Sequence, residues 1–342
     1  MSKILMIYTG GTIGMVRNPE TGVLEAFSAE NLSANIPEMK YCGADVDMVS
    51  FDSPIDSSDM NPGHWSSIVR IICEHYEPYD GFVILHGTDT MAFTASALSF
   101  MLEGLSKPVI LTGSQLPVEM IRSDAKENLL TAIEIAAAKD ANGHPMVPEV
   151  CIYFHDELLR GNRSSKISAE YLAAFASNNY PVLAHTGTDI TYHREFIRPY
   201  DPSVKLTPHY EMESGIVILS LFPGLQAEAV EEVLGQPSVK GVIFRTFGSG
   251  NAPRNERLLQ ALAKAVKAGK TIVNITQCAT GSVQMKRYAT GRQLLEAGVI
   301  SGRDSTVEAA LTKLMFLMGQ GLSQAEIREK MNLSLAGEIS LS

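Results

Sequence analysis

Short apolar runs rich in β-branched residues alternate along the chain with longer stretches whose apolar residues recur at helical spacing. Short runs bounded by glycine and polar clusters are typical of buried strands, and the longer stretches are typical of helices. This alternation predicts an α/β fold with largely parallel sheets. In the first half, strands are expected at residues 3–8, 47–51, 82–86, 109–112, 150–154 and 181–185, and helices at 65–76, 91–105 and 125–139.

The pattern loosens between residues 188 and 208, where three prolines lie among polar residues. Proline removes a backbone donor and interrupts regular elements, which favours a connecting segment. We therefore predict an N-terminal domain over 1–187, a linker over 188–208 and a C-terminal domain over 209–342.

A second α/β series follows the predicted linker. Strands open near residues 215, 241 and 271 and run into glycine-bearing loops, and helices are expected at 227–234, 255–268, 306–318 and 324–331. The last two helices are each preceded by Ser-x-x-Glu, which predicts capping boxes at Ser305/Glu308 and Ser323/Glu326.

Composition narrows the functional classes. The 342 residues are 45% hydrophobic and 19% charged, as expected of a globular protein, and the net charge of −10 disfavours nucleic acid and anionic membranes as partners. The N-terminal run MSKILMIYTGG is interpreted as a strand rather than a signal peptide. Four scattered cysteines without a CxxC pair fit a reduced, cytoplasmic setting. The histidines show no metal-ligand spacing, so no metal and no cofactor are expected.

Candidate chemistry is sought in the loops after the strands, because ligands bind beyond the carboxyl ends of open α/β sheets. The first such loop, TGGTIG, has glycines that permit a close backbone approach to a ligand, and it carries Thr12. A threonine hydroxyl is a nucleophile only when a base takes its proton. A plain turn and an incomplete dinucleotide motif are the alternatives.

Two further loops carry hydroxyls beside carboxylates. Ser57 and Ser58 in DSSD suit binding of an amino-acid carboxylate, with Asp59 as a helix cap the alternative. Thr88 and Asp89 in HGTDT suit orienting a water and holding an ammonium, and capping of the next helix is again the alternative. The polar segment RGNRSSK adds Lys166, either a base in a desolvated site or a solvated surface charge.

The segments TGGTIG, DSSDM, HGTDTM, KPVILTGSQ and RGNRSSK, in this order and spacing, resemble the L-asparaginase family, in particular its bacterial type I, cytoplasmic branch. FGSGNAP, NITQC, YATG and TVEAALTKL extend the likeness through the second half. The resemblance implies two α/β domains and hydrolysis of the side-chain amide of L-asparagine to aspartate and ammonia. A threonine would attack the amide carbon, ammonia would leave, and water would release aspartate from the acyl-enzyme.

The resemblance also assigns roles to residues. Thr12 matches the nucleophile, Thr88 and Lys166 form a hydroxyl–amine dyad, and Asp89 fixes its geometry and takes the substrate ammonium. Further substrate contacts are implied for Gly11, Ser57, Ser58, Ser114, Gln115 and Asn251, with backbone N–H groups near Gly11 and Thr88 as the oxyanion donors. One departure concerns the loop at 22–27, where family members often carry a tyrosine and this chain has none.

The family implies an assembly as well. Sites would form between subunits of an intimate homodimer, which can pair into a tetramer, with Asn251 reaching the neighbour's site. Some type I enzymes have a regulatory asparagine site, and Arg245, Cys278 and Ser165 lie where it would be. For Cys278 we favour a small buried core residue.

Two other functions remain as alternatives. The first is the asparaginase-like subunit of a tRNA-dependent amidotransferase, which would need an additional domain and a basic face. The second is a nucleotide-binding or sensor protein that uses the glycine-rich loop, against which the incomplete fingerprint argues.

Overall fold

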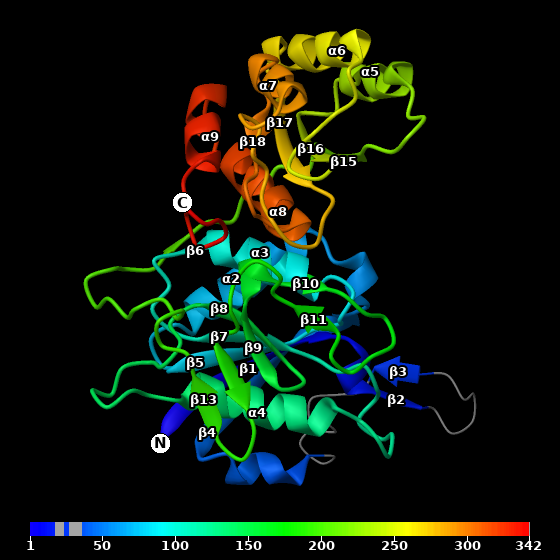
Figure 1. Cartoon of the computed structure of the whole chain (residues 1–342). Helices are drawn as coiled ribbons and strands as arrows, with labels where there is room; N and C mark the ends of the chain where they lie inside the picture. The colour runs from blue at the N-terminus through cyan, green and yellow to red at the C-terminus, as the bar shows by residue number, and fades with distance from the viewer. Residues whose placement is uncertain (18–23, 27–35, 342) are drawn as a thin grey trace. The chain divides into compact units, whose positions relative to one another are not determined.

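The computed structural model describes residues 1–17, 24–26 and 36–341 of the chain. These residues form two compact units, Met1–Tyr210 and Glu211–Ser342 (Figure 1). Both units are α/β with mostly parallel sheets, which confirms the fold class predicted from the apolar runs. Within the described residues, no helix is long and apolar enough to cross a bilayer.

The N-terminal unit is built on one mixed sheet, whose described strands follow the order β13-β12-β9-β8-β7-β5-β1-β4. The parallel part comprises β4 (Ala44–Ile55), β1 (Ser2–Gly10), β5 (Gly81–Leu85), β7 (Val109–Thr112) and β8 (Val150–Phe154). The edge strands β9 (Glu157–Arg160), β12 (Ala184–Thr186) and β13 (Ile190–Tyr192) run antiparallel to their neighbours. Strands β5, β7 and β8 are buried along their whole length, which explains their continuous apolar sequences.

Helices α2 (Pro62–Glu74), α3 (Met91–Met101) and α4 (Ala125–Ala137) complete this unit (Figure 1). Leu129 and Ile133 of α4 pack on Met6 and Leu85, which lie on one face of the sheet. Alternate residues of the strands are therefore covered by one helix, and the remaining buried positions face the other side.

The segment expected as a linker differs in the structure. Residues 190–192 form β13, which pairs with β12, and β14 (Thr207–Pro208) pairs with β6 (Leu102–Glu103). The compact unit accordingly runs on to Tyr210. Pro208 is itself part of β14, where it pairs with Leu102.

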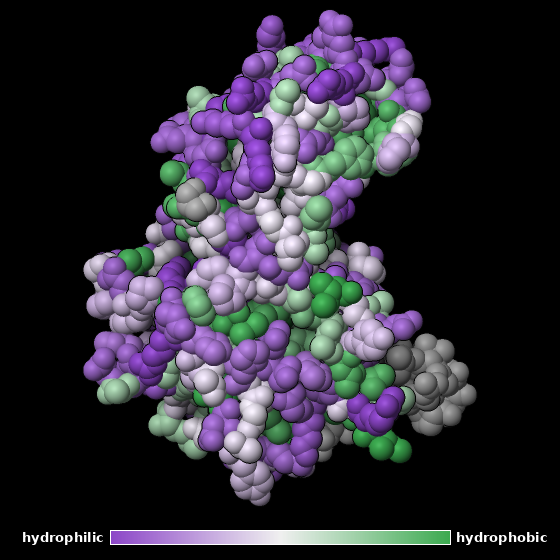
Figure 2. Space-filling model, viewed as in Figure 1, coloured by the Kyte–Doolittle hydropathy of each residue, from purple (hydrophilic) through white to green (hydrophobic). Residues whose placement is uncertain are grey.

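The C-terminal unit has a parallel sheet in the order β15-β16-β17-β18. Its described elements are β15 (Ile216–Ser220), α5 (Ala227–Gly235), β16 (Gly241–Thr246), α6 (Glu256–Lys267), β17 (Thr271–Thr276), α7 (Ala289–Glu296), β18 (Ile300–Ser301), α8 (Val307–Gly319) and α9 (Gln324–Met331). Helix α6 buries Leu258 and Leu262 and turns charged residues outward, on the hydrophilic surface in Figure 2.

The two capping predictions have different outcomes. Ser323 and Glu326 form the expected capping box at α9. The box at Ser305/Glu308 is wrong: Thr306 caps α8 by accepting from the Ala309 N–H, while the Ser305 hydroxyl donates to the Gly302 carbonyl. The helix begins one residue later than the motif suggests, so a second hydroxyl takes the cap.

Candidate active site

Three glycine-bearing or hydroxyl-bearing loops meet at the carboxyl end of the N-terminal sheet. Strand β1 pairs with β5 through Tyr8 and Leu85 and with β4 through Gly10 and Ile55, so the loops after these strands begin side by side. A Cβ atom on Gly11 would lie 2.5 Å from the Gly87 nitrogen, and one on Gly87 would lie 2.5 Å from Ser57 Oγ. No side chain fits between these backbones, and φ of Gly11 is +92°. Thr12 and Thr88 each follow one of two touching glycines.

Thr12 opens the 3-10 turn η1 (Thr12–Gly14) and is half-buried. The turn is closed by the Gly14 N–H, which donates to the Gly11 carbonyl over 3.2 Å. Below it, the buried Tyr8 hydroxyl donates to the Gly14 carbonyl, also at 3.2 Å. The tyrosine that family members often carry would fall in the loop at 22–27, of which residues 22, 23 and 27 lie outside the described residues.

Thr88, Asp89 and Lys166 form one hydrogen-bonded group. Lys166 Nζ donates to Thr88 Oγ1 over 2.8 Å and to Asp89 Oδ1 over 2.7 Å. The lysine side chain is 19% exposed, whereas that of Asp89 is 66% exposed. Lys166 ends the short strand β10 (Ser165–Lys166), which pairs with β11 (Phe175–Ala176). The lysine is therefore held against the loop by these two bonds.

Gln115 and Ser114 follow β7 but differ in their contacts. Thr88 Oγ1 donates to Gln115 Oε1 over 3.1 Å, and Gln115 Nε2 donates to the Tyr171 carbonyl. The Ser114 hydroxyl turns away and donates to the Leu116 carbonyl over 2.7 Å. Gln115 thus joins the Thr88 group directly, and Ser114 stabilises its own loop.

Ser57 and Ser58 lie in the 3-10 turn η3 (Ser57–Asp59). Ser57 is only 4% exposed, beneath Gly87, and its carbonyl accepts from the Thr90 hydroxyl over 2.7 Å. Ser58 is exposed and donates to Asp56 Oδ1. Neither of the capping alternatives is formed: Asn61, not Asp59, caps α2, and α3 starts after Thr90 without a side-chain cap from Thr88 or Asp89.

Two residues that the sequence did not single out support the site. Asp124 is 7% exposed, and its carboxylate accepts from the Gln115 and Leu116 N–H groups, which fixes the loop after β7. The His86 side chain is buried in the core, and its Nδ1 donates to the carbonyl of the next residue, Gly87, over 2.7 Å. For His86, the only sequence signal of a role in the site was its position directly before the Gly-Thr-Asp loop. For Asp124, the sequence contains no such signal.

Comparison with known proteins bears on this arrangement. Residues 3–198 match the family described as "Asparaginase, N-terminal", and residues 215–331 match "Glutaminase/Asparaginase C-terminal domain". The chain belongs to the asparaginase family. The resemblance found in the loop motifs is thereby confirmed.

The relatives of this asparaginase-family chain include enzymes and solved structures. It is 45% identical to "L-asparaginase 1" of Escherichia coli (strain K12), over 99% of this chain and 98% of that protein. It is 43% identical to the human "60 kDa lysophospholipase", over 99% of this chain and 61% of that protein. The crystal structure of L-asparaginase I from Vibrio cholerae superposes with a TM-score of 0.90 at 42% identity, covering 99% of both chains.

The remaining candidate residues, Asn251, Arg245, Cys278 and Ser165, differ in their surroundings. Asn251 Oδ1 accepts from the Thr290 hydroxyl over 2.9 Å. Among the described residues, no hydrogen-bond partner reaches the buried Nε of Arg245. Cys278 is exposed, so the expected core position is wrong, because the chain leaves β17 two residues earlier and enters a loop. Ser165 is half-buried in β10 of the other unit.

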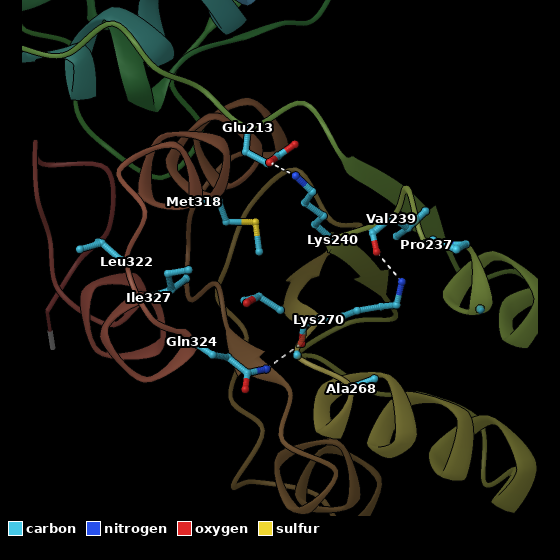
Figure 3. Close-up of a pocket in the computed structure, with 13 residues that line it drawn as sticks. Glu213, Pro237, Val239, Lys240, Ala268, Lys270, Met318, Leu322, Gln324 and Ile327 are labelled. Atoms are coloured by element: carbon cyan, nitrogen blue, oxygen red, sulfur yellow. Dashed lines mark hydrogen bonds and ion pairs between the residues drawn. The ribbon is translucent and has the colours of Figure 1, made fainter.

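A cavity of about 580 Å³ also lies in the C-terminal unit (Figure 3). Its cations already have protein partners: Lys240 pairs with Glu213, and Lys270 donates to the Gln236 carbonyl over 2.7 Å. Met318, Leu322 and Ile327 supply apolar lining. Lys240 and Lys270 directly precede β16 and β17, so the cavity lies at the amino ends of the strands. This is the end of a parallel sheet opposite to the usual ligand site.

Proposed function

We propose that this chain is an L-asparaginase, which hydrolyses the side-chain amide of L-asparagine to L-aspartate and ammonia with a threonine nucleophile. The observation that carries this proposal is the contact of Lys166 with Thr88 and Asp89, beside the glycine pair that Thr12 and Thr88 follow. The identity to L-asparaginase 1 over nearly the whole of both chains supports the same activity.

The arrangement suits a two-step reaction. Thr12 Oγ1 attacks the amide carbon and loses its proton, the C–N bond breaks, and the departing nitrogen takes up a proton to leave as ammonia. Thr88 and Lys166 then orient and deprotonate a water, which attacks the ester and releases aspartate and the Thr12 hydroxyl. Backbone N–H groups near Gly11 and Thr88 are the donors for the oxyanion, and loss of one such donor typically costs about 100–1000-fold in rate.

Substrate recognition follows from the remaining hydroxyls and carboxylates. Ser57 and Ser58 offer donors for the α-carboxylate of asparagine. The Asp89 carboxylate is largely exposed, and its Oδ1 contacts Lys166. As the negatively charged group of the site, Asp89 pairs with the α-ammonium of asparagine. Gln115 borders the reacting amide through its contact with Thr88.

Ammonia release from L-asparagine and L-glutamine, without tRNA, tests the activity and separates it from an amidotransferase subunit. We expect near-total loss in Thr12→Ala, Thr88→Val and Lys166→Met, with unchanged circular dichroism. Thr188→Ala, at an exposed hydroxyl of the same unit, is the matched control. Wild-type turnover in Thr12→Ala would show that another group attacks, and peptide mass spectrometry after rapid acid quench then locates the acyl group.

The assembly is proposed as a cytoplasmic homodimer or a dimer of dimers, in which Asn251 completes the neighbour's site. The free cysteines of the structure fit a reducing compartment. Mixing inactive Lys166→Met with Asn251→Ala subunits tests the shared site, because one mixed site would regain both groups. A regulatory site at Arg245, Cys278 and Ser165 predicts sigmoidal dependence on asparagine that Arg245→Ala removes.

A further inference from the structure

A chain of hydrogen bonds runs through the core of the N-terminal unit to the Gly87–Thr88 peptide. Trp65 Nε1 on α2 donates to Thr94 Oγ1 on α3 over 2.9 Å, and Thr94 Oγ1 lies 2.9 Å from His86 Nε2. His86 Nδ1 in turn lies 2.7 Å from the Gly87 carbonyl oxygen. Trp65 is 5% exposed, and Thr94 and His86 are fully buried.

For a neutral His86 ring, the direction of every bond in this chain is fixed by its two ends. An indole N–H only donates and a carbonyl oxygen only accepts, so Thr94 accepts from Trp65 and donates to His86 Nε2, and His86 donates from Nδ1. Burial lowers the pKa of His86 to about 4, against a smaller opposing effect of the Gly87 carbonyl. The ring is therefore neutral at pH 7 and holds one tautomer, protonated at Nδ1.

This tautomer bears on the loop because the Gly87 carbonyl and the Thr88 N–H belong to one peptide unit. In a planar trans peptide these two groups point in opposite directions. A bond that holds the carbonyl toward the core therefore turns the Thr88 N–H to the other side. Glycine constrains its own backbone weakly, so the orientation of this peptide depends on such outside contacts.

We propose that His86 is a positioning residue, which with Trp65 and Thr94 holds the Gly87–Thr88 peptide so that the Thr88 N–H faces the oxygen of the amide under attack. The inference rests on the proposed asparaginase mechanism and adds to it the means by which one oxyanion donor is preorganised. His86 itself touches neither the substrate nor the attacking hydroxyl.

Steady-state kinetics on asparagine separate positioning from simple packing. His86→Leu removes both ring bonds, whereas His86→Asn keeps an N–H near the Nδ1 position. Losing the ring bond that holds the Gly87 carbonyl predicts a fall in kcat of about fivefold to tenfold in His86→Leu, with KM within about twofold. His86→Asn restores most of kcat. Thr94→Val keeps the shape of the side chain but removes the hydroxyl that donates to His86 Nε2, so the ring is no longer held in one tautomer. This variant gives an intermediate kcat.

Ser96→Ala is the matched control, because Ser96 is a buried hydroxyl of the same helix α3 that has no hydrogen-bond partner among the described residues. Its kcat stays at the wild-type value. A folded His86→Leu protein with wild-type kcat would overturn the proposal. Equal losses of kcat in His86→Asn and His86→Leu would also overturn it. If His86→Leu does not fold, the kcat values expected above for His86→Asn and Thr94→Val provide the test.

Long-range ¹H–¹⁵N spectra of histidine-labelled protein give a readout that does not depend on activity. Only Nδ1 of His86 is expected to carry a proton at pH 7, and Thr94→Val is expected to add the second tautomer. A proton on Nε2 of His86 in the wild type would refute this chain of hydrogen bonds even if asparagine is hydrolysed. Failure of the wild type to hydrolyse asparagine, with the expected tautomer, would instead refute the proposed function.

Discussion

Lys166 Nζ lies 2.8 Å from Thr88 Oγ1, although the two residues are 78 positions apart in the sequence. The lysine also contacts Asp89, and its side chain is 19% exposed. A cation in this position can act in two ways. It can serve as a fixed charge that holds Thr88 and Asp89, or it can give up its proton and become the base of the dyad.

The variant Lys166→Arg distinguishes these roles. A guanidinium keeps the positive charge beside Asp89 but does not lose a proton at accessible pH. If Lys166 is the base, kcat falls by at least about 100-fold in Lys166→Arg, the low end of general-base effects. Lys240→Arg, at the exposed ion pair with Glu213, is the control and keeps wild-type kcat. Retention of most activity in Lys166→Arg would show that charge alone is needed.

Asp124 provides a second prediction, about the loop that carries Gln115. Its buried carboxylate accepts from the Gln115 and Leu116 N–H groups and from Asn128 Nδ2. Asp124→Ala leaves these donors without their acceptor, at a cost of about 1–3 kcal/mol for each buried group that stays unpaired. We expect urea unfolding to show a loss of about 3 kcal/mol.

The same variant should also lower kcat, because Gln115 would no longer be held against Thr88. Asp201→Ala is the control for the stability measurement, since Asp201 caps an exposed turn through the Ser203 N–H. A loss in Asp124→Ala no larger than that in Asp201→Ala would contradict the role assigned to this carboxylate.

The sequence predicted the central strands well and the edges poorly. Strands β5, β7 and β8 are covered on both faces, so their sequences are continuous apolar runs that can be recognised without the structure. The edge strand β13 has three residues and only intermediate or exposed positions, so its sequence carries no comparable pattern. Its place is set by pairing with β12, which local sequence does not report.

The candidate site shows the same division. Motif resemblance brought Thr88, Asp89 and Lys166 together, and their hydrogen bonds agree with that grouping. Asp124 and His86 act through backbone groups of loops, and any acidic or imidazole side chain in the right place could make those bonds. The prediction for Cys278 was wrong because it rested on residue type alone, and free cysteine is most often buried. The exposure of this cysteine instead depends on where β17 ends.

His86 gives a prediction for the pH dependence of stability. The pKa of this group is lowered to about 4 by burial, against about 6.5 in an unfolded chain. Between these values the unfolded chain binds the extra proton, so the folded state loses stability as the pH falls from about 6.5 to 4. The free energy of unfolding should drop by about 3 kcal/mol from this group alone.

Urea unfolding of wild type and His86→Asn at pH 7, 6, 5 and 4.5 measures this effect. The difference between the two proteins isolates the histidine, because carboxylates contribute to both. The contacts of the ring are Thr94 and the Gly87 carbonyl, which carry no charge. Parallel pH profiles for the two proteins would contradict a neutral buried imidazole.

The ion pair of Lys313 and Glu338 fixes the last residues of the chain to α8. Both side chains are buried, with exposures of 2% and 1%. Glu338 also accepts from the Leu335 and Ala336 N–H groups, and Lys313 Nζ donates to the Met331 carbonyl over 3.3 Å. Burial lowers the pKa of Lys313, and the charge of Glu338 opposes that effect. Each charge is thus tolerated only because the other is present.

Lys313→Met should therefore destabilise the protein by about 3–5 kcal/mol, because it leaves the Glu338 carboxylate buried without its cation. In Lys313→Met/Glu338→Gln the charge is gone from both positions and an amide oxygen can still accept from the backbone, so the double variant should be more stable than Lys313→Met. Urea unfolding of the two single variants and the double variant gives the coupling energy. If the losses of the two single variants simply sum to the loss of the double variant, the pair does not interact as its burial implies, and the C-terminal segment must be held by its apolar contacts instead.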